Sequence, residues 1–152
     1  MNRKPNFVNI FLSILVGMTL LVSAAQPNLV FASTEYAGGE GIRTSVHPQT
    51  GKLSFLGADP SSPIRVDAAM RTDLSAEGRG MAILDVYGRQ FGLKNPQEEL
   101  RLTSTREMDG RGTKKYQQLY QGIPVMAGEL IVNTNAQGGL LSINGEVSPD
   151  LD

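Results

Sequence analysis

The spacing of apolar residues changes near residue 93 of this chain, and this change limits the folds open to it. Just before that point, over residues 75–91, they recur with the period of a helix, and one face carries Met81, Leu84, Tyr87, Gly88 and Phe91. After it, apolar and polar residues alternate in short segments, which is typical of strands. A helix followed by antiparallel strands predicts an α+β fold, with one main helix packed on a curved antiparallel sheet of about four strands.

Glycine and proline set the expected bounds of the helix. Gly78 and Gly80 each weaken a helix interior by about 1 kcal/mol relative to alanine, so we expect the firm part to begin near Met81. Gly92 suits a left-handed stop, and Pro96 is expected to prevent the helix from resuming.

Alternation after the helix predicts four strands and two tight turns. The strands cover residues 100–108, 114–120, 128–133 and 140–147, and the turns cover 109–112 and 135–139. The side chains expected to be buried on these strands are Leu130, Val132, Leu141, Ile143 and Val147. Before the helix, a hairpin is expected from residues 42–46 and 52–56, followed by a loop over 57–63.

The first 25 residues have the organisation of a secretory signal peptide. Arg3 and Lys4 precede an apolar stretch over 10–22, which as a helix is about 20 Å long and too short for a hydrocarbon core of roughly 30 Å. We expect cleavage after residue 25, or as late as 32, with an uncleaved anchor as the alternative. Residues 26–41 predict a flexible linker, and the folded domain is expected to occupy 42–152 of an exported, secreted protein.

Composition excludes several kinds of site. The chain has no cysteine and one histidine, His47, so thiolate metal sites, histidine zinc sites and a serine triad lack their residues. The formal net charge is −1, and nucleic acid is therefore not an expected partner. We expect a protein that is not an enzyme and that needs no metal or cofactor.

Other polar stretches have plainer interpretations. Adjacent Glu98 and Glu99 are expected at a helix start or on the surface, and His47 in a solvated turn. Asp150 and Asp152 are expected to be solvated rather than cation ligands. The glycine-rich residues 38–41 lack the strand and helix of a phosphate-binding loop.

A rigid strand-to-strand corner is predicted just after residue 120. Gly122 can take a positive φ, Pro124 holds the residue before it extended, and Gly128 lets backbones approach closely.

Three side chains before the corner alternate onto one face of the strand. Tyr116 and Tyr120 are expected to pack in the core rather than to bind a ligand. Gln118 lies between them and is expected to satisfy backbone groups at the corner.

Residues 116–132, YQQLYQGIPVMAGELIV, resemble the core signature of the fungalysin/thermolysin propeptide domain, and the resemblance extends over about 59–152. The family pattern has an aromatic residue where this chain has Met126, and His or Arg where it has Tyr116; Met126 is expected to loosen packing beside the turn. The positions carried over as structural motif residues, and as a candidate interface, are Gln118, Tyr120, Gly122, Pro124, Val125, Gly128, Glu129 and Gly145.

The resemblance implies a non-catalytic pro-region that assists folding of a secreted thermolysin-like zinc metallopeptidase and inhibits it. Neither an HExxH helix nor the companion pro-region domain called PepSY occurs in these 152 residues. The expectation is therefore a precursor fragment, a truncated reading frame or a copy acting in trans on its protease. The alternative is a free-standing secreted or cell-envelope binding module without a protease partner.

Overall fold

The computed structural model describes residues 41–149 and 151. The predicted signal peptide, almost all of the predicted linker, and Asp150 and Asp152 lie outside the described residues.

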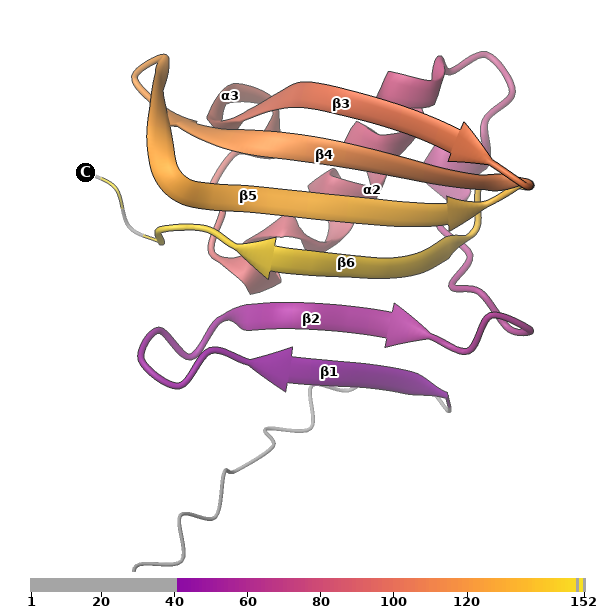
Figure 1. The fold of residues 1–152 in the computed structure, drawn as a ribbon, viewed down its shortest axis with the longest axis horizontal. Helices are drawn as coiled ribbons and strands as arrows, with labels where there is room; N and C mark the ends of the chain where they lie inside the picture. The colour runs from indigo at the N-terminus through magenta and orange to yellow at the C-terminus, as the bar shows by residue number, and fades with distance from the viewer. Residues whose placement is uncertain (1–40, 150, 152) are drawn as a thin grey trace, which may run out of the picture. The chain divides into compact units, whose positions relative to one another are not determined.

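Within the described residues, six strands form one antiparallel sheet in the order β1-β2-β6-β5-β4-β3 (Figure 1). The strands are β1 (Ile42–Val46), β2 (Leu53–Ala58), β3 (Leu100–Met108), β4 (Arg111–Tyr120), β5 (Ile123–Asn135) and β6 (Leu140–Glu146). The expected α+β class with one main helix is confirmed, but the expected number of about four strands is wrong.

The two additional strands are the predicted N-terminal hairpin, which joins the sheet through β2. Leu56 of β2 lies opposite Ile143 of β6, and Phe55 lies opposite Asn144. This pairing joins segments almost ninety residues apart. The local sequence of the hairpin therefore does not show with which strand of the sheet β2 pairs.

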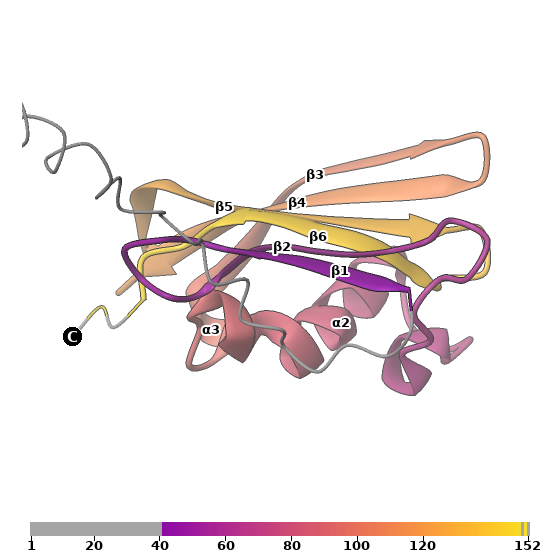
Figure 2. The same ribbon diagram turned by 90° about the horizontal axis from the view of Figure 1, so that it is seen from below.

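All the helices of the described residues lie on one face of the sheet, and no described helix covers the other face (Figure 2). They are the 3-10 helix η1 (Asp67–Met70), the main helix α2 (Ala76–Phe91) and the one-turn helix α3 (Pro96–Glu99). The core therefore lies between α2 and a single face of the sheet.

Helix α2 has a cap at each end. The hydroxyl of Ser75 accepts a hydrogen bond from the backbone N–H of Gly78 at 3.1 Å. Gly92 takes a φ of 112°, and the N–H of Leu93 donates to the carbonyl of Gly88 at 3.0 Å, which closes the last turn. The expected extent of the helix is confirmed.

The first turns of α2 are as regular as the rest, contrary to the expectation of a firm start only near Met81. Gly80 is buried, and a Cβ added to it would overlap the hydroxyl oxygen of Tyr116. Glycine fits here because it lets the helix pack closely on β4, and this packing offsets its low helix propensity.

Pro96 begins helix α3 instead of preventing further helix. A proline fits the first helical position, where its missing N–H would have no partner. The carboxylate of Glu99 accepts hydrogen bonds from the backbone N–H groups of Lys94 and Asn95, which holds the chain as it enters α3. The predicted helix-start role of Glu98 and Glu99 is confirmed.

The predicted core faces are largely correct. Leu84, Phe91, Leu130, Val132 and Ile143 are each at most 1% exposed, and Val147 is 8% exposed. Further fully buried core residues are Ile83, Tyr116 and Leu140.

Leu141 is the residue of this set that was wrongly expected in the core. Thr134 lies opposite Leu140 and Asn133 opposite Ser142, so Leu141 is an extra residue in a β-bulge. The bulge moves Leu141 to the open face and brings Leu140 into the core in its place.

Candidate functional site

The corner that follows β4 begins with a two-residue turn. Gln121 and Gly122 have φ values of 50° and 81°, and Tyr120 lies opposite Ile123 across the turn. Positive φ at both central residues is the hairpin geometry whose twist matches the flanking strands. A Cβ at Gly122 would meet no atom within 4 Å, so its backbone conformation alone requires glycine.

Strand β5 then bends sharply (Figure 1), because β4 and β5 lose register there. Gln117 lies opposite Glu129 and Leu119 opposite Pro124, which leaves the segment 125–128 facing only Gln118. Ala127 takes a φ of 59° within this bulge.

Gln117 holds the bulge together. Its side-chain amide nitrogen donates to the carbonyl oxygens of Val125 at 2.7 Å and Gly128 at 2.9 Å. Sequence reasoning assigned the bonding of backbone groups at the corner to Gln118 and missed Gln117. Both are glutamines just before the corner, and only the bulge shows which side chain reaches its carbonyl groups.

Gln118 instead fixes the segment after β6. It is fully buried, its amide nitrogen donates to the carbonyl of Ser148 at 2.9 Å, and its amide oxygen accepts from the N–H of Ser148 at 2.8 Å. A Cβ at Gly128 would lie 2.8 Å from that amide oxygen, so the close approach expected at Gly128 is to the Gln118 side chain.

The two tyrosines differ. Tyr116 is fully buried and its hydroxyl donates a long hydrogen bond to the carbonyl of Glu77 at 3.5 Å, so its expected core role is confirmed. Burial, with a smaller effect of the Glu77 charge, raises the pKa of the Tyr116 phenol well above its usual value. Tyr120 is only half-buried, at the end of the sheet, and does not belong to the core cluster, so its expected core role is wrong.

Two further motif residues, Glu129 and Gly145, contribute to the structure of the sheet. Glu129 forms an ion pair with Lys115 at 2.7 Å, with both side chains about two-fifths exposed. Gly145 has a φ of 127°, and its backbone passes so close to Glu129 that an added Cβ would overlap the Glu129 carbonyl oxygen.

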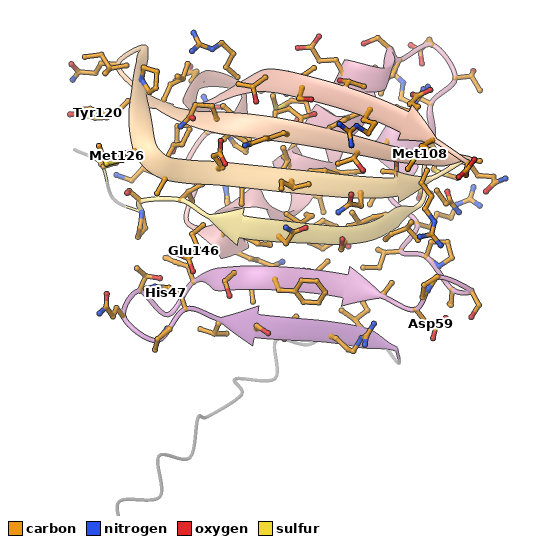
Figure 3. The ribbon with its side chains drawn as sticks, viewed as in Figure 1. His47, Asp59, Met108, Tyr120, Met126 and Glu146 are labelled. Atoms are coloured by element: carbon orange, nitrogen blue, oxygen red, sulfur yellow. The ribbon has the colours of Figure 1, made fainter. Side chains whose placement is uncertain are left out.

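Apolar side chains are exposed along the corner. Met126 is 94% exposed and Ile123 is 68% exposed, and Pro124 is also exposed. Met126 and Tyr120 lie at the same end of the sheet (Figure 3). Met126 therefore packs against nothing beside the turn, contrary to expectation, and these residues are available to a partner.

A groove of about 660 Å³ lies on the open face at the other end of the sheet. Arg43, Arg106 and Arg111 line it together with apolar Phe55 and Leu141. No described residue forms an ion pair with these arginines. Sequence reasoning missed this groove because its residues come from all six strands of the sheet.

His47 lies in the β1–β2 turn as expected, but it is not simply solvated. Its Nδ1 lies 3.3 Å from the N–H of Thr50, and its Nε2 lies 3.9 Å from the carboxylate of Glu146. Over residues 41–149 and 151, no group of three or more His, Cys, Asp or Glu side chains is placed to hold a metal ion. Within the same residues, no helix combines the length and apolar character needed to cross a membrane.

The class defined so far is an α+β domain with helices on one face of its sheet, an open second face and an exposed apolar corner. Residues 98–147 match the family model of the Fungalysin/Thermolysin Propeptide Motif, so the resemblance is confirmed over this part of the chain. Comparisons with curated proteins and with solved structures found no match.

The matched segment begins in α3 and ends just after β6, and so contains the corner. This motif is the propeptide of fungalysin and thermolysin-like metallopeptidases, which are secreted, and it is a non-catalytic part of their precursors.

Proposed function

We propose that this chain is the pro-region of a secreted thermolysin-like metallopeptidase, whose catalytic domain it helps to fold and keeps inactive. The observation that carries the proposal is the propeptide-motif match over residues 98–147. Binding to the catalytic domain can account for both the folding assistance and the inhibition. Neither needs a reactive group in the pro-region.

The corner is the part of the domain that we assign to the contact. A specific interface buries about 1,200–2,000 Å² in total, with apolar side chains at its centre. The exposed side chains of Ile123 and Met126 offer such a centre, and the turn and bulge hold their backbone in one shape. The peptidase is bound in cis within a longer precursor or in trans as a separate chain.

Inhibition in trans tests the proposal. The protein is added to a thermolysin-like protease encoded near its gene, and both the peptidase activity and the refolding yield of the denatured protease are measured. We expect micromolar inhibition and a higher refolding yield. If both quantities stay unchanged at high micromolar concentration, the alternative function as a free-standing binding module takes the place of the pro-region.

Variants locate the contact. Ile123→Ala with Met126→Ala removes exposed apolar area, so it should weaken inhibition at least about fivefold without altering thermal stability. Val86→Ala is the matched control, because Val86 is 50% exposed on α2, away from the corner. Pro124→Ala should weaken inhibition together with a loss of thermal stability, since it loosens the corner. Equal inhibition by the double variant and the control would exclude the corner as the contact.

A further inference from the structure

Lys114 of β4 is buried on the helix side of the sheet. Its side chain is 3% exposed, although lysine is almost never fully buried without a partner. No described residue forms a hydrogen bond or ion pair with its ammonium group. The ammonium nitrogen itself keeps contact with solvent, because among the described residues no buried side-chain nitrogen or oxygen lacks a hydrogen-bond partner.

Two glycines make room for this side chain. A Cβ at Gly80 of α2 would lie 2.7 Å from Cδ of Lys114, and a Cβ at Gly112 would lie 3.2 Å from its Nζ. An alanine at either position would crowd the lysine. The packing therefore holds the ammonium at a defined position.

That position is in the wall of a cavity of about 410 Å³, at the end of the sheet where the β3–β4 and β5–β6 turns meet. Arg79 and Arg111 line the same cavity, with the hydroxyl-bearing Thr134. Met108, which also lines it, lies at the end of the sheet opposite Tyr120 and Met126 (Figure 3).

The acids of the cavity do not neutralise these cations by direct contact. Glu107 and Asp109 line it but are exposed, and among the described residues neither is within ion-pair distance of Lys114, Arg79 or Arg111. The cations include the buried Lys114, whereas both carboxylates remain hydrated. An anion in the cavity would supply the counter-charge that Lys114 lacks.

The electrostatics of Lys114 agree with this geometry. Burial lowers its pKa, the charge of Glu107 raises it, and the charge of Arg79 lowers it again. The charges of Lys114 and Arg79 therefore repel each other across the cavity. A negative group between them would relieve both the desolvation and the repulsion.

We propose that this cavity binds one carboxylate, held between the Lys114 ammonium and the Arg79 guanidinium. A carboxylate fits better than a phosphate because Glu107 and Asp109 repel a second negative charge. Its source is either an acidic side chain of a protein partner or a small free carboxylate. The site is independent of the proposed protease contact, which uses the opposite end of the sheet.

The first test is thermal unfolding of the protein while chloride is replaced by acetate at constant ionic strength. At about ten times the dissociation constant, linkage predicts a rise in Tm of about 5 °C. Lys114→Met should abolish the rise, while Glu107→Gln should increase it by removing a repelling charge. Lys115→Met is the matched control, since this neighbouring lysine already pairs with Glu129, and it should keep the rise.

The second measurement needs no variant. The side-chain NMR resonances of Lys114 should shift on acetate addition, whereas those of Lys115 should not. N-acetylglutamate amide and its glutamine counterpart distinguish the sources, because tighter binding of the glutamate compound than of acetate indicates a partner side chain.

Three results would overturn the proposal. Equal rises in Tm for the wild type and Lys114→Met would mean that acetate acts elsewhere. A larger effect of inorganic phosphate than of acetate would assign the site to phosphate. A loss of stability in Glu107→Gln that acetate restores, with no acetate effect on the wild type, would make Glu107 the natural counter-ion.

Discussion

Burial on β6 changes between neighbouring residues, and the bulge at Leu141 decides which of them enter the core. Ile143 lies opposite Val132 and is fully buried, while Leu141 is half-buried on the open face. Strict alternation would put both on the same face. The extra residue in the bulge breaks this alternation.

Ile143→Ala should therefore lower the free energy of unfolding by about 2–5 kcal/mol, the usual cost of a cavity in a core. Leu141→Ala is the matched control, and it should cost clearly less because its site opens to solvent. Urea denaturation of both variants measures the difference. Equal losses would show that the bulge does not separate the two faces.

Lys114 should make stability depend on pH in a particular direction. Burial lowers its pKa in the folded state, so in the window between that value and the pKa of an unfolded lysine, about 10.4, the unfolded chain binds more protons. The contribution of Lys114 to stability therefore rises with pH through this window and is most unfavourable below it.

Lys114→Met should consequently be more stable than the wild type at neutral pH, and this advantage should shrink as the pH approaches 10. Urea denaturation in carboxylate-free buffers at both pH values measures it. Lys115→Met is measured at the same pH values as a control, because the other titrating groups contribute to the stability of both variants. An advantage that stays constant with pH would show that Lys114 is not desolvated in the folded state.

Helix α2 can lie close to β4 because residue 80 is a glycine. Gly80 faces Tyr116 and Lys114 of β4, whereas the nearest atoms to a Cβ at Gly78 are 3.4 Å away, on Leu74 and Ser75. The same residue type therefore has different roles two positions apart. One glycine lets two elements pack closely, and the other only lowers helix propensity.

Gly80→Ala should destabilise the protein by about 1–3 kcal/mol, because the added methyl group overlaps the Tyr116 hydroxyl. Gly78→Ala should be neutral or stabilise by up to about 1 kcal/mol through helix propensity. Thermal unfolding followed by circular dichroism compares the two. A stabilising Gly80→Ala would mean that α2 lies farther from β4 than described.

The whole domain is larger than the segment that matches the propeptide motif. Residues 98–147 supply β3, β4, β5 and β6, but α2 and the β1–β2 hairpin lie before them. The core face of the matched strands is covered by Ile83, Leu84 and Phe91 of α2, and β2 adds Leu53 and Leu56. The matched segment alone would expose its apolar face to water.

A polypeptide of residues 98–147 should therefore not fold, whereas residues 41–152 should unfold cooperatively. A few strands without a covering layer bury too little apolar area to offset the conformational entropy of ordering them. NMR chemical-shift dispersion and thermal melts of the two polypeptides measure this. A dispersed spectrum for the shorter one would contradict the assignment of α2 to the core.

The sequence by itself predicted the features that depend on neighbours along the chain. The period of α2 and its stop at Gly92, the Asp109-Gly110 turn, the turn at Gly122 and the inward faces at Leu130, Val132 and Ile143 all follow from residues a few positions apart. The propeptide resemblance was also contained in one continuous stretch. In each case a local backbone preference or a short period decides the result.

Only the tertiary structure decided the features that depend on segments distant in the chain. It joined the β1–β2 hairpin to β6, placed Leu141 on the open face, separated the roles of Gln117 and Gln118, and buried Lys114 against Gly80. Each of these depends on which strands pair and in which register. Register is selected by packing the whole apolar face at once, so no short window of sequence contains it.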